Sequence, residues 1–171
     1  LQLADEGKLD LDDRVGDLLP AFPHVNPNIT VRQLLRHQSG LYDVITNPAY
    51  DQASKSRLDS IWSLSNLVRD YIKAPLFAAG TNWSYSNTNY ALLGLIVEAV
   101  TGKPYYEEYE RRFFTPLNTP TIVLPPYDPY PAKVAHLWTD TNGDGVTEDL
   151  HSFFSRWRSF QTSAGPIGAY Y

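Results

Sequence analysis

Tyr85 and Asn87 are the residues of this sequence whose types and spacing are best suited to chemistry. In an extended segment, residues two positions apart point the same way, so the phenol and the carboxamide would share one face while Ser86 turns from it. A tyrosine hydroxyl acts as a general base only when neighbouring cations lower its pKa from about 10, and a lysine would serve. An asparagine amide offers a donor and an acceptor to a substrate amide or to that lysine. The pair therefore predicts a catalytic site at Tyr85 and Asn87, with Asn87 also binding substrate.

The same tripeptide also fits a purely structural role. In that interpretation Tyr85 lies in a turn and Asn87 caps the helix that follows. Taken without their surroundings, these three residues favour the structural role, so the neighbouring segments must decide between the two.

The segments around the pair predict a mainly α fold with a C-terminal third of irregular chain and short β structure. Leu1 to Glu6 has the pattern of a helix end that stops at a glycine. Residues 47–60 are polar and aperiodic, which predicts a surface loop or lid. Further helices are expected from apolar spacing and capping residues at 31–37 behind Thr30, at 64–72, at 89–100 and at 104–114. The helix at 89–100 is apolar almost all round, so it should be central and buried.

Composition excludes several classes of protein. With 43% hydrophobic and 19% charged residues, the 171-residue chain should fold around one core. The formal charge of -5 argues against a nucleic-acid partner. The longest apolar run, residues 91–97, is far too short to span a membrane. Cysteine is absent, which excludes disulfides, thiolate metal sites and a cysteine nucleophile.

The C-terminal third holds two weaker candidate sites. Asp140, Asn142 and Asp144 have the oxygen spacing that opens a calcium loop, but the position of the closing glutamate is occupied by His151. A tight turn rich in Asp and Asn side chains is therefore favoured over a metal site, and no cofactor is expected. Trp138 belongs to an aromatic cluster that could line a substrate cleft or equally pack in a core.

Four blocks of this sequence, in order and in register, resemble the β-lactamase-related serine hydrolases, which include class C β-lactamases, penicillin-binding proteins, D-alanyl-D-alanine carboxypeptidases, D-aminopeptidases and related esterases. The blocks are Gly-Lys-Leu-Asp-Leu-Asp-Asp at 7–13, Ile-Thr-Val-Arg-Gln-Leu-Leu-Arg-His-Gln-Ser-Gly-Leu at 29–41, Gly-Thr-Asn-Trp-Ser-Tyr-Ser-Asn-Thr-Asn-Tyr at 80–90, and Leu-Leu-Gly-Leu-Ile-Val-Glu-Ala-Val-Thr-Gly-Lys-Pro at 92–104. The resemblance implies a serine, activated by a lysine three residues later, that attacks a carbonyl and forms an acyl-enzyme. It also implies that Tyr85 shuttles protons and that Asn87 holds the substrate amide and the lysine.

Two motifs of that family are missing from this sequence. No serine has a lysine three positions later, and no Lys-Thr-Gly or His-x-Gly segment occurs in a suitable place. We therefore expect residues 1–171 to be a single partial domain, the helical insertion domain of an α/β fold, without the nucleophile-bearing part and the C-terminal sheet. Such a fragment should be inactive alone, while its parent enzyme would act on a small-molecule or peptide substrate. The resemblance also implies a periplasmic or secreted location, which the residues themselves leave open.

Two interpretations from other classes remain open at this point. The chain could be a non-catalytic binding or sensor module that keeps the fold of the penicillin-binding proteins, or a structural domain stabilised by calcium. The substrate also remains open among β-lactams, D-amino-acid peptides and esters, because fold and motif do not fix specificity.

Overall fold

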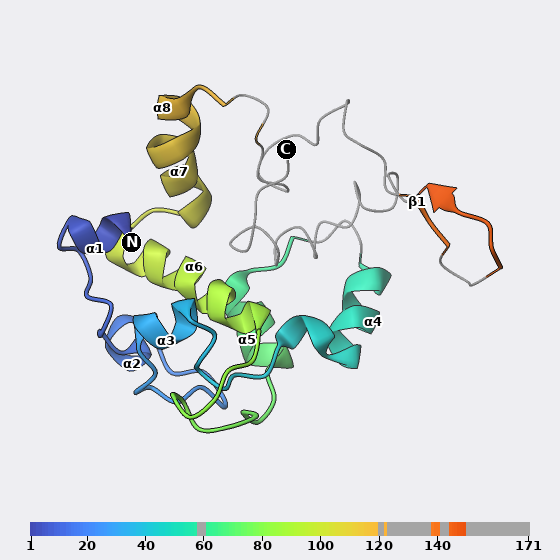
Figure 1. Cartoon of the computed structure of the whole chain (residues 1–171), viewed down its shortest axis with the longest axis horizontal. Coiled ribbons are helices and arrows are strands. Elements are labelled where there is room, and N and C mark those ends of the chain that lie inside the picture. The colour runs from blue at the N-terminus through green and yellow to red at the C-terminus, as the bar shows by residue number, and fades with distance from the viewer. Residues whose placement is uncertain (58–60, 120–121, 123–137, 141–143, 150–171) are drawn as a thin grey trace.

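The computed structural model describes residues 1–57, 61–119, 122, 138–140 and 144–149. In this part of the chain the structure is largely helical, with one pair of short strands (Figure 1). The elements are α1 (Gln2–Asp5), α2 (Val15–Leu18), α3 (Val31–Leu35), the 3-10 helix η1 (Val44–Thr46), α4 (Pro48–Ser56), α5 (Leu64–Tyr71), α6 (Asn87–Thr101), α7 (Tyr105–Tyr109), the π-helix η2 (Glu110–Phe114), α8 (Thr115–Leu117), β1 (Trp138–Thr139) and β2 (Glu148–Asp149).

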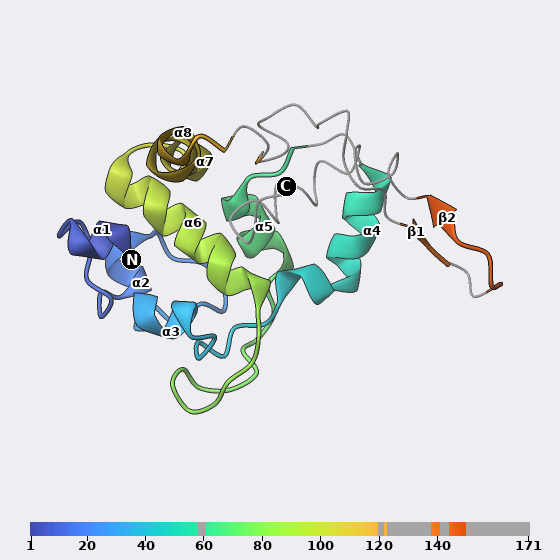
Figure 2. The same ribbon diagram turned by 45° about the horizontal axis from the view of Figure 1, so that its top comes forward.

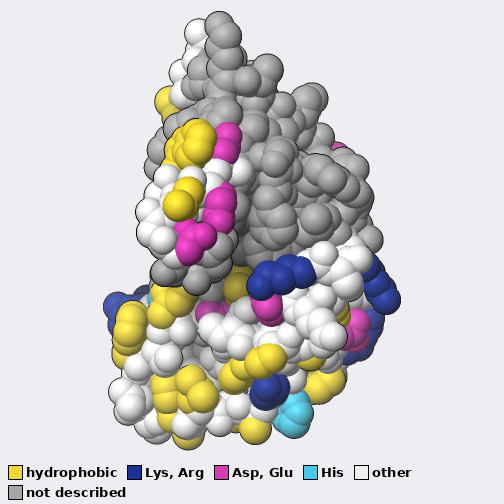
Figure 3. All heavy atoms as spheres, turned by 90° about the vertical axis from the view of Figure 1, so that its right-hand side faces the viewer, with side chains coloured by type: hydrophobic (Ala, Val, Ile, Leu, Met, Phe, Trp, Pro, Cys, Tyr) yellow, Lys and Arg dark blue, Asp and Glu magenta, His cyan; other side chains and the backbone are white. Residues whose placement is uncertain are grey.

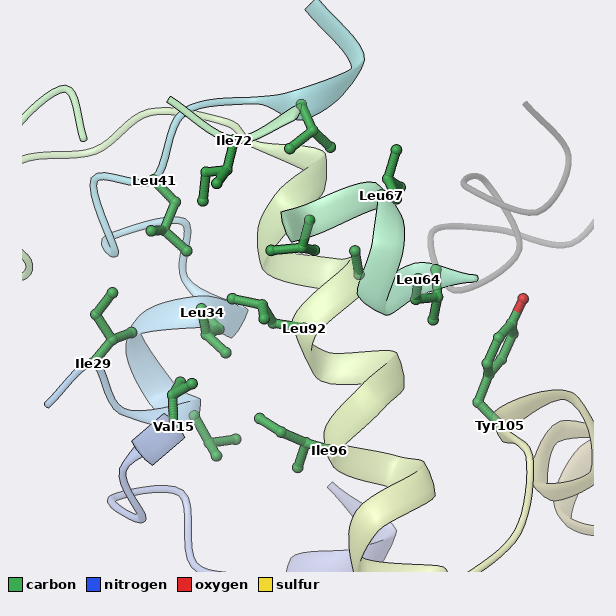
Figure 4. Packing of buried hydrophobic residues seen from close by; sticks show 14 of the residues in the cluster. Val15, Ile29, Leu34, Leu41, Leu64, Leu67, Ile72, Leu92, Ile96 and Tyr105 are labelled. Atoms are coloured by element: carbon green, nitrogen blue, oxygen red, sulfur yellow. The ribbon is translucent and has the colours of Figure 1, made fainter. Parts of the chain in front are cut away.

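Helix α6 is the centre of the molecule, as its apolar pattern predicts. It packs against α3 and α5, and its C-terminal half also meets α7. Leu92 and Ile96 of α6 are buried against Leu34 of α3 and Leu67 of α5 (Figure 4). Burying such side chains stabilises the fold by about 1.5–3 kcal/mol each. The core therefore fixes the direction of α6, and with it the place where the helix begins.

Capping residues set the ends of several helices where the sequence predicts them. Thr30 accepts a hydrogen bond from the Gln33 backbone, and the Gln33 side chain accepts one from the Thr30 backbone, which forms a capping box before α3. Gly102 ends α6 with φ 67°. This left-handed conformation suits glycine, which has no Cβ to clash.

The expectation of a surface loop at residues 47–60 is wrong for most of that segment. Pro48 to Ser56 form helix α4, and residues 58–60 lie outside the described part of the chain. The Asn47 side chain accepts a hydrogen bond from the Ala49 backbone and caps the helix, and Pro48 occupies its first turn. Tyr50 and Ser54, four residues apart, turn one face of α4 inward. One apolar residue on that face was too little for the periodicity to be recognised.

The helix expected at 104–114 is present but changes character along its length. It begins after Pro104 as α7, widens into the π-helix η2 and continues as α8 to Leu117, past the predicted end at Phe114. Pro116 stands near the C-terminal end of this continuous segment, which ends at Leu117. The helical expectation is thus confirmed, with an end three residues later.

An ion cluster ties this second helical segment to the first helix of the chain. Arg112 donates to Glu108 at 2.6 Å and to Glu6, and Arg111 also donates to Glu108 at 2.7 Å. The Arg112 and Glu108 side chains are only 9% and 4% exposed. Glu6 follows α1, so the cluster joins residues more than a hundred positions apart. Both ribbon views show α1 near the C-terminal end of α6, where the chain continues into α7 (Figures 1 and 2).

The C-terminal third contributes one described β pair. Strands β1 and β2 are antiparallel, with Trp138 opposite Asp149 and Thr139 opposite Glu148. This short hairpin agrees with the expectation of short β structure, and most other residues of that third lie outside the described part. On the face shown in Figure 3, acidic and basic side chains lie side by side in the lower part, whereas the described residues in the upper part carry acidic and hydrophobic side chains. None of the described helices combines the length and apolarity that a membrane span requires.

Candidate functional site

The candidate site lies where two segments meet at the start of α6. The turn at residues 37–43 runs beside the segment at 76–86, and backbone hydrogen bonds from Leu76 to Gly40 (2.8 Å) and from Ser84 to His37 (3.1 Å) hold them together. Gly40 has φ 75°, and a Cβ there would lie 2.1 Å from the Phe77 carbonyl oxygen. Only glycine allows this close approach, so the Ser-Gly turn brings the two segments together.

Tyr85 and Asn87 are brought together as the sequence predicts. The Tyr85 hydroxyl donates to Asn87 Oδ1 at 3.0 Å, and Asn87 Nδ2 donates to Asp43 Oδ2 at 2.8 Å. Tyr85 is half exposed, so the pair lies at the surface. The Tyr85 hydroxyl donates to one end of the Asn87 amide, and the Asp43 carboxylate accepts from the other end.

A buried polar network lies next to this pair, on the side that faces the interior of the molecule. The Ser39 hydroxyl donates to Asn89 Oδ1 at 2.5 Å, and Asn89 Nδ2 lies 3.0 Å from His37 Nδ1. The Ser86 backbone N–H also donates to His37 Nδ1, at 3.3 Å. Ser39, Ser86 and Asn89 are buried, so these hydrogen bonds form away from water, where unpaired polar groups are costly.

These partners determine the protonation state of His37. Its Nδ1 accepts from two donors and so carries no proton, which leaves the neutral ring with its proton on Nε2. Burial lowers the pKa of His37, and the Asp43 charge opposes this in part. The neutral imidazole packs against the rings of Tyr85 (4.6 Å between centroids) and Tyr90 (5.4 Å). His37 thus supports the Tyr85 ring without placing a positive charge beside it.

The electrostatic surroundings of Tyr85 disfavour its ionised form. Burial raises its pKa, and the Asp43 carboxylate and Tyr90 raise it further. Each of these causes opposes the lowered pKa that a tyrosine base requires. Among the described residues, no Lys or Arg side chain acts on Tyr85 to lower this pKa.

The helix-cap interpretation of Asn87 is wrong. Helix α6 begins at Asn87 itself and its N-cap is Ser86, whose side chain makes no capping bond but donates to the Tyr42 carbonyl at 3.3 Å. The next residue, Thr88, also donates to that carbonyl, at 2.6 Å. The side chain of Asn87 therefore does not cap the helix, and it hydrogen-bonds to Tyr85 instead.

Sequence reasoning missed two neighbours of the pair, Asp43 and His37. His37 was expected only as the last residue of the helix at 31–37, whereas in the structure it contacts the site. Asp43 stands three residues beyond the Ser-Gly turn with no local pattern to mark it. The one signal in the sequence was their position: His37 lies within the family-like block at residues 29–41, and Asp43 lies two residues after it.

The remaining candidates lie apart from the pair. Trp138 belongs to β1 and is 59% exposed. Both ribbon views show strand β1 on the far side of α4 from α6 (Figures 1 and 2). Asp140 accepts hydrogen bonds from the Asp144 and Gly145 backbones, which is the turn favoured for this segment. Asn142 lies outside the described residues, and within the described part no group of three His, Cys, Asp or Glu residues could hold a metal ion.

A cavity of about 440 Å³ lies elsewhere, between α1, α3, α6 and α7. Its walls are mostly aliphatic and aromatic, and its charged members, Glu108 and Arg112, are paired with each other. Neither Tyr85 nor Asn87 lines it. The cavity therefore belongs to the packing between helices and not to the candidate site.

Solved structures place this fold in one class with penicillin-binding proteins and D-amino acid amidases. A D-stereospecific amidohydrolase from Streptomyces sp. is similar with TM-score 0.81 and 32% identity, over 96% of this chain and 51% of that one. A penicillin-binding protein from Bacillus halodurans has TM-score 0.72 and 29% identity, over 92% and 48% of the two chains. The D-amino acid amidase from Ochrobactrum anthropi SV3, complexed with D-phenylalanine, has TM-score 0.73 and 26% identity, over 97% and 46%.

Sequence comparison agrees with the structural likeness. The family model described as Beta-lactamase matches residues 1–165, so the chain belongs to the beta-lactamase family. Protein flp of Staphylococcus aureus (strain COL) is 34% identical over 127 residues, which are 69% of this chain and 24% of that protein. Penicillin-binding protein 4 of Amycolatopsis lactamdurans is 30% identical over 98% of this chain and 42% of its own length. The chain thus spans about a quarter to a half of its relatives.

Proposed function

We propose that the chain is part of a serine hydrolase that acts through an acyl-enzyme on amide, β-lactam or ester bonds. Tyr85 moves the proton in this proposal, and Asn87 holds the substrate amide. The hydrogen bond of 3.0 Å between the Tyr85 hydroxyl and Asn87 Oδ1, at the start of α6, carries the proposal. Membership of the beta-lactamase family supports it.

The proposed reaction begins with a serine outside this sequence, because no serine here has a lysine three positions later. An unactivated serine hydroxyl is a poor nucleophile, so a base must take its proton as its oxygen bonds to the substrate carbonyl carbon. Tyr85 takes this proton as the phenolate, which makes it a neutral phenol, and then gives the proton to the leaving group. Since burial and Asp43 raise the pKa of Tyr85, the proposal requires a cation that lowers it, supplied by the lysine that follows the nucleophile.

The names of the similar structures guide the choice of substrate. Two of them are a D-stereospecific amidohydrolase and a D-amino acid amidase, and a third is a penicillin-binding protein. D-Amino-acid amides are therefore the first substrates to test, followed by β-lactams and esters. The non-catalytic sensor and the calcium-stabilised domain have no specific observation in their favour.

Tyr85→Phe in the full-length gene product tests the proposal. The change keeps the ring that packs on His37 and removes only the hydroxyl, so thermal stability should barely move. Turnover of D-phenylalanine amide should fall by roughly 10²- to 10⁴-fold, as general acid-base catalysis requires.

Two controls accompany this measurement. Tyr90→Phe removes the same atom from another ring that packs on His37 and should leave most activity. Residues 1–171 alone should not be labelled by a fluorescent penicillin, because they carry no activated serine. Unimpaired acylation and deacylation by the Tyr85→Phe variant would refute the role of Tyr85, and stoichiometric labelling of the chain alone would refute the external nucleophile.

A further inference from the structure

His37 holds the chain on both sides of Tyr85. Its backbone carbonyl accepts a hydrogen bond from the Ser84 backbone at 3.1 Å, and its side-chain Nδ1 accepts one from the Ser86 backbone at 3.3 Å. Between these two bonds, the imidazole ring packs against the Tyr85 ring, with 4.6 Å between the centroids. A single residue therefore fixes the ring of Tyr85 and the backbone before and after it.

The backbone conformation of His37 is unusual for a histidine. Its φ of 55° is left-handed, and the N–H groups of His37 and Gln38 close the end of α3 through hydrogen bonds to the carbonyls of Leu34 (3.1 Å) and Gln33 (2.9 Å). Glycine is the usual residue at this position, because it has no Cβ that resists a left-handed φ. Ending the helix therefore does not require a histidine, whereas the contacts of its side chain do.

The hydrogen bond to Ser86 depends on an unprotonated Nδ1. Ser86 is buried, and its hydroxyl is already bonded to the Tyr42 carbonyl at 3.3 Å. A proton on Nδ1 would set two N–H groups against each other, and an unpaired buried donor is costly. A backbone N–H, unlike a side-chain amide, cannot turn away without moving the residues on either side, which here are Tyr85 and Asn87. Loss of the acceptor therefore displaces the pair.

We propose that His37 is a positioning residue for acyl transfer, whose neutral imidazole holds Tyr85 and Asn87 where the reaction needs them. This inference rests on the proposed function, because it assigns His37 to the same site. The contrasting role is a purely structural one, in which His37 ends α3 and its contacts with residues 84–86 have no consequence for the chemistry.

The surroundings of His37 set the direction of the pH dependence that follows. Burial lowers its pKa from the ordinary 6.5, and the Asp43 carboxylate at the start of η1 opposes this in part. Tyr85 and Tyr90 face the ring with phenols that bring no positive charge, and the preceding residue, Arg36, is exposed to solvent. The site should therefore be intact above pH 6.5 and be lost as pH falls through the lowered pKa of His37.

Two substitutions separate the positioning role from the structural one. His37→Asn provides an amide oxygen as acceptor for the Ser86 backbone, does not titrate, and tolerates the left-handed φ. His37→Ala provides no acceptor and leaves the Ser86 N–H unpaired. The same two changes at His24 are matched controls, because His24 is exposed and has a similar φ of 58°.

The experiment follows the turnover of D-phenylalanine amide by the full-length gene product from pH 8 to pH 5. For the unmodified protein, kcat should fall as His37 takes up a proton below pH 6.5, and this acid limb should move to lower pH in His37→Asn. At pH 8, His37→Ala should lower kcat roughly 10- to 100-fold, the size of effect expected when a reacting group is misplaced, while KM changes much less. His37→Asn should retain more of the kcat than His37→Ala, and both His24 variants should match the unmodified protein.

An NMR titration of the same protein gives a readout that does not depend on activity. Histidine is labelled by ¹⁵N in the ring, and the His37 signals are assigned through their loss in His37→Asn. They should report an unprotonated Nδ1 at pH 8, and they should titrate at the same pH as kcat.

The outcomes distinguish this inference from the function on which it rests. An acid limb that keeps its position in His37→Asn, undiminished kcat in His37→Ala, or a protonated Nδ1 at pH 8 would overturn the positioning role of His37 alone. Full turnover by both Tyr85→Phe and Asn87→Ala would overturn the proposed function, and the positioning role with it.

Discussion

At the scale of single residues, Asn87 is held in one orientation by neighbours of different chemistry. Tyr85 donates to one end of its amide, and Asp43 accepts from the other. The residue stands inside the first turn of α6, where an asparagine makes no contribution as an N-cap. Its side chain thus contributes to the site and little to the helix.

Replacement of Asn87 tests this distinction. Asn87→Ala in the full-length protein should lower kcat and raise KM for D-phenylalanine amide, because the group proposed to position the substrate is lost. The free energy of unfolding, measured with urea on the chain, should change little. Thr30→Ala is the matched control, since Thr30 is a true N-cap and its loss should cost about 1 kcal/mol. A similar cost for Asn87→Ala with intact kinetics would restore the capping role.

His37 predicts a pH dependence of stability. Because the pKa of His37 is lowered in the folded chain, the unfolded chain binds a proton more readily, so stability should fall as pH drops below about 6.5. His37→Asn should weaken this dependence, since an asparagine oxygen can replace Nδ1 as acceptor and asparagine tolerates the φ of 55° at this position.

Urea unfolding of the chain between pH 7.5 and 5 measures this effect. His24→Asn is the matched control, because His24 is exposed and has a similar φ of 58°. If the His37→Asn chain loses stability toward pH 5 as steeply as the unmodified chain, the two donors to Nδ1 are not the cause of the pH dependence.

The residue pair was predictable from the sequence, whereas its neighbours were not. Two positions of separation place Tyr85 and Asn87 together whatever the rest of the fold does. Asp43 and His37 reach the pair from 44 and 49 positions away in the sequence, as their hydrogen bonds to residues 87 and 86 show. Contacts of that kind depend on tertiary structure, which local spacing does not encode.

At the scale of elements, the Ser-Gly turn controls how closely the two segments of the site approach. Gly40→Ala should destabilise the chain by about 2 kcal/mol or more, because the new Cβ would meet the Phe77 carbonyl and the residue would keep a left-handed φ. Gly102→Ala is the control, with φ 67° and no atom within 4 Å of its added Cβ. Its cost should be that of the conformation alone, about 1–2 kcal/mol. Equal urea midpoints for the two variants would show that the close approach can relax.

Helices were predicted correctly where the local sequence carries a strong signal, such as a capping residue or a long apolar run. The N-cap of α3 and the apolar α6 were predicted correctly because capping residues and a long apolar run act locally. Helix α4 was missed because its sequence is mostly polar. The helix is stabilised by the Asn47 cap and by the burial of Tyr50. The prediction of a helical insertion domain within a larger fold stays a prediction.

At the scale of the whole molecule, the ion cluster of Glu6, Glu108 and Arg112 links the two ends of the helical part. Arg111 and Arg112 hold the pKa of Glu108 at about 2, and Arg112 and Lys8 hold that of Glu6 at about 2, both below the ordinary 4.5. Their contribution to stability is therefore complete above pH 4.5 and is lost as pH falls toward 2. Arg112→Met should lower stability at pH 7 and make the remaining stability less sensitive to acid over this range.

Acid titration followed by circular dichroism measures this change. Arg69→Met is the control, because Arg69 pairs with Asp70 at the surface, where ion pairs contribute little. An acid-unfolding profile of the Arg112→Met chain that has the same shape as that of the unmodified chain would exclude the cluster as the acid-sensitive link between α1 and α7.

The hydrogen bonds that join Tyr42 and Asp43 to the start of α6 also tie off a loop of chain that contains α4 and α5. Closing a flexible loop of twice the length costs only about 0.6 kcal/mol more. Insertions between α4 and α5 should therefore be tolerated while these hydrogen bonds to the start of α6 stay intact. This part of the chain is where we expect evolution to vary what surrounds the site without disturbing its chemistry.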